Sequence, residues 1–344
     1  MEVPAHRRAP LQQVLELLWR AQRIVLTTHV NADGDGCGSE AALGGWLVRE
    51  GKRVTVANPT PFPPLYRHLL AEEIEVAEPG SARAEAALRE ADVVVVLDTG
   101  ELKRLGRVAR ALEGKQVVVI DHHPPGDSEI GWLGIRDPTA CATGELIYDL
   151  LLLVGDRAEP WPKGVVEGIY TAILTDTGSF RFANTTPRAH QIAADLMSRG
   201  VDPEAIYRQI FATFPLRRIR VLRAALEGLE VDPDLPISWI TIPGRLVEEL
   251  GASSEDLEGI VEYARSIEGT EVALLFRETN GATKVSFRSN GDLDVNELAR
   301  QFGGGGHAKA AGALIGAPLE RVREAVLNAT RAAVRELERR SQGR

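Results

Sequence analysis

One short segment early in the chain combines an imidazole with two carboxylates. It contains His29, Asp33 and Asp35 with glycines interleaved, and it follows the apolar run Ile24–Leu26, which predicts a buried strand. Side chains of this kind, delivered together at the end of a strand, suit divalent cations such as Mn²⁺ or Mg²⁺. A solvated acidic turn has the same composition, so the interpretation depends on the rest of the chain.

Three further segments end in residues of the same chemistry. The apolar runs Val93–Leu97 and Val117–Ile120 predict buried strands, and a third segment ends at Leu174. The residues that follow these segments are Asp98, then Asp121, His122 and His123, and finally Asp176. In an open parallel sheet the carboxyl ends of the strands share one edge, where ligands bind, so we expect the four segments to converge.

These residues supply what a two-metal centre needs. Such a centre holds two ions about 3.5 to 4 Å apart on nitrogen and oxygen ligands, with a carboxylate that bridges them. The candidate metal ligands are His29, Asp33, Asp35, Asp98, His122 and Asp176, with Asp98 as the natural bridge. Water held between two such ions becomes hydroxide near neutral pH and attacks phosphorus, so the pattern predicts phosphoester hydrolysis.

Two further residues that follow Val117–Ile120 are expected to support this chemistry. His123 is expected to lie beside the metal ligands as a catalytic group, in addition to Asp98, and to contact a phosphate oxygen or assist a proton transfer. Asp121 is expected to orient a histidine through a hydrogen bond. Adjacent histidines after a strand also occur as a partly buried structural pair, but the convergence of four segments favours the metal interpretation.

A glycine tract near the C-terminus predicts a second functional element. The run Gly303–Gly306 is either a flexible linker or a loop whose backbone N–H groups close on a phosphate or sugar, and its neighbours Phe302 and His307 favour the loop. Arg288, on a neighbouring predicted hairpin, suits a bidentate phosphate clamp, although an exposed strand arginine has the same sequence signature. The predicted substrate contacts are Arg288, Gly304, Gly305, Gly306 and His307.

The elements that must position the first group of residues alternate between helix and strand. The strand before His29, a crossover helix and a strand at Val54–Ala57 form a βαβ beginning. The expected helices are about 10–20, Ser39–Arg49, Ser81–Glu90, Arg104–Leu112 and Thr143–Leu153. Val165–Leu174 fits a helix as well as a strand. The alternation predicts an α/β fold with a doubly wound, mostly parallel sheet.

A helical connector is expected to lead to a smaller α/β domain. Its expected helices are Arg188–Ser198, Pro203–Phe211 and Leu216–Leu229. Expected strands follow at Ile237–Ile242, Glu271–Glu278 and Thr283–Ser289, with an Asn280-Gly281 turn between the last two and a closing helix at Leu319–Leu337. We therefore expect a catalytic domain at 1–186, the connector at 187–235 and a substrate-binding domain at 236–344.

The composition is that of a globular chain that acts on small ligands. The hydrophobic content of 44% is ample for two cores. A formal charge of −9 argues against binding of long duplexes, although a short anionic substrate is compatible with it. Cys37 and Cys141 are too few for a disulfide framework. Because no apolar run has the length of a membrane span, we expect a cytoplasmic protein with no membrane partner.

The motifs resemble those of the DHH phosphoesterases. The four segments that carry the resemblance are His29–Asp35, Asp98, Asp121–His123 and Thr175–Gly178, and Gly303–His307 resembles the signature of the DHHA1 domain that follows in one branch. No expected metal position departs from the family pattern. The resemblance therefore implies a DHH domain and a DHHA1 domain with an active site in the cleft between them.

The resemblance also implies a division of the ligands between two ions. His29 and Asp33 would serve one ion, and Asp35, His122 and Asp176 would serve the other. It implies Mn²⁺ as the preferred metal, with Mg²⁺ as the alternative, and a homodimeric assembly.

Within the family the chain resembles the small, stand-alone NrnA-type, RecJ-like proteins. That resemblance implies exonucleolytic hydrolysis of short oligonucleotides (nanoRNA or short DNA) to mononucleotides. It also implies removal of the 3′-phosphate of 3′-phosphoadenosine 5′-phosphate to give AMP. The alternatives are a soluble phosphodiesterase for pApA or a cyclic dinucleotide, and a non-catalytic nucleotide-binding or replication-partner protein.

Overall fold

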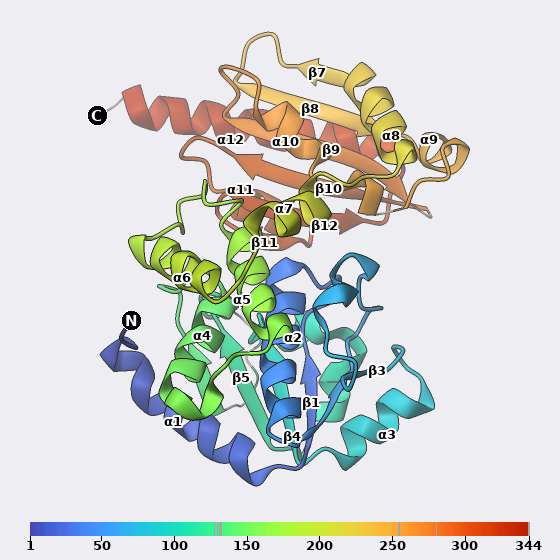
Figure 1. Ribbon diagram of the computed structural model, residues 1–344. Coiled ribbons are helices and arrows are strands. Elements are labelled where there is room, and N and C mark those ends of the chain that lie inside the picture. The colour runs from blue at the N-terminus through green and yellow to red at the C-terminus, as the bar shows by residue number, and fades with distance from the viewer. Residues whose placement is uncertain (127, 129, 131–132, 254, 280, 343–344) are drawn as a thin grey trace. The chain divides into compact units, whose positions relative to one another are not determined.

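The chain forms two compact units, Met1–Ala212 and Thr213–Arg344 (Figure 1). The computed structural model describes residues 1–126, 128, 130, 133–253, 255–279 and 281–342. Each unit is built around one six-stranded sheet, so the expected α/β class with two domains is confirmed. Among the described helices, none combines the length and the apolar character needed to cross a membrane.

The sheet of the first unit is parallel throughout and has the strand order β3-β2-β1-β4-β5-β6. Its strands are β1 (Arg23–Thr27), β2 (Arg53–Val56), β3 (Glu75–Val76), β4 (Val93–Leu97), β5 (Val117–Asp121) and β6 (Leu133–Arg136). The chain order reverses between β1 and β4, which makes the sheet doubly wound and opens a crevice at the carboxyl ends of these two strands. The sequence predicted β1, β2, β4 and β5, but not the short β3 or the glycine-containing β6.

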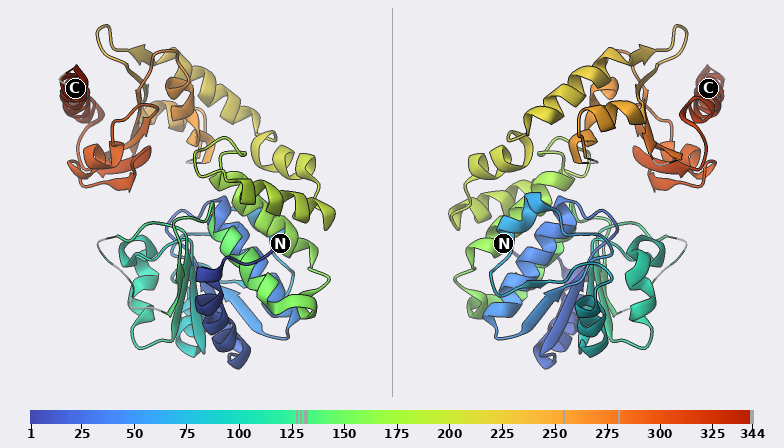
Figure 2. Two further views of the ribbon diagram at one scale, coloured as in Figure 1. Left: turned by 90° about the vertical axis from the view of Figure 1, so that its left-hand side faces the viewer. Right: turned by 90° about the vertical axis from the view of Figure 1, so that its right-hand side faces the viewer.

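Helices cover both faces of this sheet (Figure 2). The helices of this unit are α1 (Ala5–Arg20), α2 (Gly34–Arg49), α3 (Ala82–Glu90), α4 (Thr143–Val154), α5 (Lys163–Asp176), α6 (Pro187–Ser198), α7 (Pro203–Phe211) and the 3₁₀ segments η1 (Pro64–Leu69), η2 (Leu102–Leu112) and η3 (Gly155–Ala158). Successive strand residues point to opposite faces. Ile24 and Leu26 therefore pack in the core with α1, α2, α4 and α5, whereas Val25 packs against α3 and η2.

For two predicted elements around the candidate ligands, one start was wrong and one choice between helix and strand had been left open. The crossover helix α2 begins at Gly34 rather than Ser39, because the Asp33 side chain caps it by accepting hydrogen bonds from the N–H groups of Asp35 and Gly36, each at 3.1 Å. The segment Val165–Leu174, which fitted a helix as well as a strand, lies in the helix α5, which ends at Asp176. Asp35 and Asp176 are thus delivered by helix ends, and the remaining ligands follow strands.

Helices α2 and α5 approach each other through glycine. A Cβ atom built on Gly38 would lie 2.4 Å from the carbonyl oxygen of Gly168, and one built on Gly168 would lie 2.6 Å from the carbonyl oxygen of Gly38. Real side chains do not tolerate such distances, so only glycine permits this packing. Because α2 carries Asp35 and α5 carries Asp176, the close approach sets the separation of two candidate ligands.

Replacing Gly38 with alanine is therefore expected to destabilise the protein by about 1–3 kcal/mol, through forced displacement of α5. The matched control is Gly45→Ala in the same helix, where the nearest atom to an added Cβ is a Val165 methyl group at 3.2 Å. Urea unfolding followed by circular dichroism compares the two variants. Equal stability of the two would show that the glycine contact does not hold the helices at their distance.

The second unit contains a mixed sheet with the order β11-β12-β10-β9-β8-β7. Its strands are β7 (Leu229–Val231), β8 (Ile237–Ile242), β9 (Val272–Thr279), β10 (Ala282–Ser289), β11 (Gly305–His307) and β12 (Ala310–Ile315). Only β8 and β9 pair in parallel; the other described neighbours are antiparallel. The hairpin expected between β9 and β10 is present, although Asn280 of its predicted turn lies outside the described residues.

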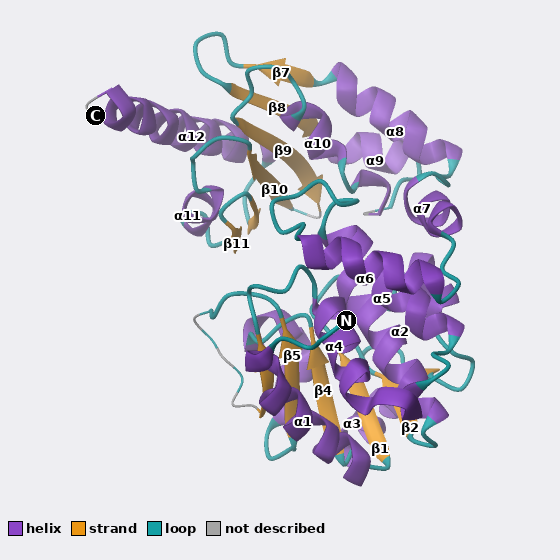
Figure 3. Cartoon of the chain, turned by 60° about the vertical axis from the view of Figure 1, so that its left-hand side comes forward, coloured by secondary structure: helices purple, strands orange, loops and turns teal. Residues whose placement is uncertain are grey.

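Helices flank this second sheet as well (Figure 3). They are α8 (Leu216–Glu227), α9 (Gly244–Glu249), η4 (Glu255–Leu257), α10 (Ile260–Arg265), α11 (Val295–Arg300) and α12 (Leu319–Gln342). Val285 and Phe287 pack with α11 and α12 on one face, and Ala273 and Leu275 pack with α8 and α10 on the other. The glycine tract was predicted as a loop, but Gly305–His307 pairs with β12 as the short strand β11.

Candidate two-metal site

The candidate ligands of the first unit converge at the carboxyl edge of its sheet. Three sets of side chains have ligand atoms that all lie within 4.8 Å of one another. The sets are His29, Asp33 and Asp98; Asp35, His122 and Asp176; and Asp98, His122 and His123. The first two sets contain the same residues as the division between two ions that the family resemblance implied, and Asp98 adjoins both of them.

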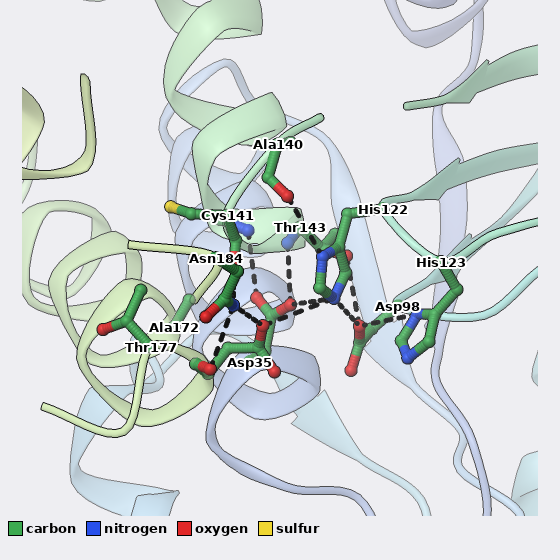
Figure 4. A network of polar contacts seen from close by, with 12 residues as sticks. Asp35, Asp98, His122, His123, Ala140, Cys141, Thr143, Ala172, Thr177 and Asn184 are labelled. Carbon is green, nitrogen blue, oxygen red and sulfur yellow. Dashed lines mark hydrogen bonds and ion pairs between the residues drawn. The ribbon is translucent and has the colours of Figure 1, made fainter. Parts of the chain in front are cut away.

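His122 lies at the centre of the second set. Its Nε2 atom is 3.6 Å from Asp35 Oδ2 and 3.5 Å from Asp98 Oδ1 (Figure 4). It is also 3.6 Å from Asp176 Oδ2. These separations are too long for hydrogen bonds, and this buried nitrogen has no hydrogen-bond partner among the described residues. Two ligands at about 2.1 Å from one ion lie about 3.0–3.5 Å apart, so the spacing suits a cation between them.

The first set is arranged around the imidazole of His29. Its Nε2 atom lies 3.2 Å from Asp98 Oδ2 and 3.6 Å from Asp33 Oδ2. Its Nδ1 atom faces the Val30 carbonyl oxygen at 2.9 Å, which fixes the orientation of the ring. His29 is buried, whereas the Asp33 side chain is 58% exposed, so this set opens towards solvent and the second set lies deeper.

Asp98 has one oxygen for each set. Oδ2 faces His29, and Oδ1 faces His122 and accepts a hydrogen bond of 3.2 Å from the Thr143 hydroxyl. The backbone of Asp98 has a φ of 60°, in the left-handed region that residues other than glycine seldom occupy. Such strain is typical of functional residues, and here it directs a buried carboxylate to the point between two ligand sets.

The electrostatics of the cluster favour a cation. Burial, together with repulsion from Asp98 and Asp176, raises the pKa of Asp35 well above its ordinary value, and burial likewise raises the pKa of Asp176 to about 6. Burial alone would lower the pKa of His29, yet its contacts with Asp33 and Asp98 raise that pKa to about 10. A divalent cation needs ionised carboxylates and neutral imidazoles, so it would replace the protons that this cluster holds without it. The residues therefore fit two divalent cations.

His123 is held beside the cluster by Asp121 and Arg104. The guanidinium of Arg104 can only donate, so His123 Nε2 accepts from it at 3.3 Å and His123 Nδ1 donates to Asp121 Oδ1 at 2.8 Å. Asp121 also accepts from the His123 backbone N–H at 3.0 Å and lies 3.3 Å from Arg136 Nε. Asp121 was expected to orient a histidine, and the one it contacts is His123 rather than the central His122.

Several residues that position the ligands carry no recognisable signal in the sequence. The N–H groups of Thr143 and Gly144, at the first turn of α4, donate to the two oxygens of Asp35 at 2.7 and 3.0 Å. Asn184 Nδ2 donates to Asp176 Oδ2 at 3.0 Å. Thr143 is far in sequence from Asp35, the carboxylate that it contacts, and its own segment indicates only the start of a helix. Asn184 matches only the pattern of a glycosylation acceptor.

The predicted substrate contacts lie together in the second unit. Arg288 is on β10, where its Nε donates to Glu262 Oε1 at 2.9 Å. Gly305 and His307 are in β11, which pairs with β12. A Cβ atom on Gly304 would lie 2.2 Å from the carbonyl oxygen of Gly312, so glycine is required for this close approach. A role in substrate binding stays a prediction for all of these residues.

The chain matches sequence profiles of two domains. Residues 23–173 match the N-terminal domain of the DHH family, and residues 242–336 match the DHHA1 domain. The matched ranges contain five of the six candidate metal ligands and all of the predicted substrate contacts. The sixth candidate ligand, Asp176, lies three residues beyond the first range.

Proteins of known sequence and structure are similar over most of the chain. The bifunctional oligoribonuclease and PAP phosphatase NrnA of Thermus thermophilus is 34% identical over 313 residues, which cover 90% of this chain and 89% of the relative. The protein of that name from Bacillus subtilis is 28% identical over 85% of this chain and 89% of its own length. The crystal structure of an exopolyphosphatase-related protein from Bacteroides fragilis superposes with a TM-score of 0.86 at 28% identity, covering 96% of each chain.

Proposed function

Because the chain belongs to the DHH family and carries its DHHA1 domain, and is thus a metal-dependent phosphoesterase, we propose that it hydrolyses short oligonucleotides exonucleolytically to mononucleotides. We propose further that it removes the 3′-phosphate of 3′-phosphoadenosine 5′-phosphate, giving AMP, as the name of its Thermus thermophilus relative indicates for that protein. Short RNA and short DNA are both included in this substrate class.

The arrangement around His122 carries the proposal. A buried imidazole nitrogen faces three carboxylates at 3.5–3.6 Å, and one of these, Asp98, turns its other oxygen to His29. We propose that His29 and Asp33 hold one ion, that Asp35, His122 and Asp176 hold the other, and that Asp98 bridges them. Mn²⁺ is the proposed metal, with Mg²⁺ as the alternative. Two such ions would supply a hydroxide nucleophile and stabilise charge on the transferring phosphoryl group.

The residues beside the ligands would handle the substrate phosphate and its protons. Asp121 fixes the tautomer of His123 so that its Nε2 atom presents a lone pair next to the Arg104 guanidinium. This pair offers an acceptor for a proton and a cationic donor for a phosphoryl oxygen at one place. We propose that the second unit contributes Arg288, the Gly304–Gly306 backbone and His307 as substrate contacts. The expected homodimer and the cytoplasmic location stay predictions.

Parallel turnover assays test this function. Metal-stripped protein is supplied with Mn²⁺ and given a labelled trinucleotide, 3′-phosphoadenosine 5′-phosphate and pApA in separate reactions. We expect mononucleotides from the trinucleotide and AMP from 3′-phosphoadenosine 5′-phosphate, both abolished by chelation. Turnover of pApA alone would favour the alternative of a dinucleotide phosphodiesterase, and binding without turnover of any substrate would favour a non-catalytic nucleotide-binding protein.

A further inference from the structure

One face of the second sheet carries a row of cations near the β9–β10 hairpin. Along β10, Val285 and Phe287 are buried against α11 and α12. Alternation therefore places Lys284, Ser286 and Arg288 on the opposite face. Arg288 is the predicted phosphate clamp, and Lys284 lies four residues from it along the strand, a separation of about 14 Å at 3.4 Å per residue.

Lys284 is directly opposite another cation on the neighbouring strand. In the antiparallel register of β9 and β10, Lys284 pairs with Arg277, and both side chains project from the same face. Like charges directly opposite each other in a sheet are destabilising. This repulsion lowers the stability of the fold, and an anionic ligand would offset it.

Within the described part of the chain both side chains are attracted by Glu258, but neither forms a direct ion pair. No hydrogen bond or ion pair joins Lys284 or Arg277 to another described side chain, whereas Arg288 has Glu262 as its ion-pair partner at 2.9 Å. Partial desolvation and repulsion from Arg277 lower the pKa of Lys284, and desolvation lowers the pKa of Arg277; in both cases attraction by Glu258 opposes the shift without cancelling it. An anion bound between the two cations would relieve this repulsion.

The surface around the pair leaves room for a nucleotide. Between Lys284 and Arg288, this face of the sheet carries the small residues Ser286 and Gly312, which are register partners on β10 and β12. Leu314, opposite Lys284 on β12, is 65% exposed and offers an apolar contact for a base. Arg277 also lines a cavity of about 400 Å³, whose other lining residues include Arg245, Val247, Leu257 and the acids Glu248 and Glu278.

We propose that Lys284 and Arg277 form a subsite for a second phosphate of the substrate strand, separate from the phosphate at Arg288. The proposal rests on the proposed function, because it extends the same substrate along the sheet. A ligand with phosphates close to one ribose, such as 3′-phosphoadenosine 5′-phosphate, is too short to reach from Arg288 to this subsite, whereas an oligonucleotide of several residues reaches it. The pair would thus select for chain length.

Steady-state kinetics of the variants Lys284→Ala, Arg277→Ala and their double variant test the subsite. For a tetranucleotide we expect kcat/KM to fall about tenfold in the double variant, through a rise in KM, with a shallower dependence on salt concentration. For 3′-phosphoadenosine 5′-phosphate we expect changes of less than about twofold. The thermal midpoint should not fall, because the substitutions remove a repulsive pair.

The matched control is Arg321→Ala, an exposed arginine on α12, which covers the other face of the sheet. It removes one positive charge, as each single variant does, and should leave kcat/KM unchanged for all substrates. An equal loss for tetranucleotide and 3′-phosphoadenosine 5′-phosphate, or no loss for either, would overturn the subsite.

A binding measurement separates failure of the subsite from failure of the proposed function. Fluorescence anisotropy of a labelled tetranucleotide is measured with Mn²⁺ in an Asp98→Asn background, once with Lys284 and Arg277 present and once with both replaced by alanine. If the parent chain hydrolyses none of the substrates, the function fails, but a tenfold weaker affinity without the pair still supports the subsite. Unchanged affinity overturns it.

Discussion

Replacing Asp98 with asparagine is expected to lower the turnover of a labelled trinucleotide by about 10³-fold or more. The change keeps the size of the side chain and its acceptor for the Thr143 hydroxyl, but it removes the charge that faces both His29 and His122. Electrostatic stabilisation of the transferring phosphoryl group supplies most of the rate enhancement in such a reaction, and in the proposed site Asp98 would hold both ions in register. Initial rates with saturating Mn²⁺ measure the loss.

The control for this variant is Asp156→Asn, an exposed aspartate of η3 that makes the same change of charge. It should retain the parent rate. Far-ultraviolet circular dichroism of both variants reports whether the fold is intact. An Asp98→Asn protein that folds and keeps more than about a tenth of the parent rate would contradict the bridging role.

Replacing Asp33 or Asp35 with asparagine is expected to remove one of two bound Mn²⁺ ions, and a different ion in each case. Asp33 lies with His29, and Asp35 lies with His122 on the other side of Asp98. Asparagine at position 33 keeps the cap of α2, since it is as good an N-cap as aspartate. Asp35 is buried and accepts two backbone N–H groups of α4, so its variant also loses one of these hydrogen bonds.

Double variants show which ion each carboxylate serves. Adding His29→Ala to Asp33→Asn should cause no further loss of metal, because both residues serve the same ion. Adding His29→Ala to Asp35→Asn should leave no bound Mn²⁺. The bound ions are counted by native mass spectrometry after dialysis. If the two double variants retain equal numbers of ions, the proposed assignment of Asp33 and Asp35 to different ions is wrong.

The strand-borne part of the site was predictable from the sequence because its strands are buried on both faces. Val93–Leu97 and Val117–Ile120 are continuous apolar runs, which is the pattern of a parallel sheet covered by helices, and each run ends at a ligand-type residue. Parallel strands share their carboxyl edge, so convergence of Asp98 with His122 followed from topology alone.

The part of the site that lies at helix ends was less predictable, because the local sequence pattern does not determine those ends. Helix α5 is buried almost all round, so its sequence lacks the polar stripe that distinguishes a helix from a strand, and the pattern left both open for the segment before Asp176. The capping role of Asp33 needs the actual start of α2, which glycines obscured. Thr143 contacts Asp35 and Asn184 contacts Asp176. Both contacts depend on tertiary packing, which the spacing of residues in the sequence does not predict.

We infer that two ions, held by separate ligand sets and joined by Asp98, carry out the hydrolysis. The most direct test titrates Mn²⁺ into metal-stripped protein while both the number of bound ions and the cleavage of a labelled trinucleotide are followed. We predict two ions per chain, with turnover that appears only as the second ion binds. Full turnover with one ion bound, or none with two, would contradict the account.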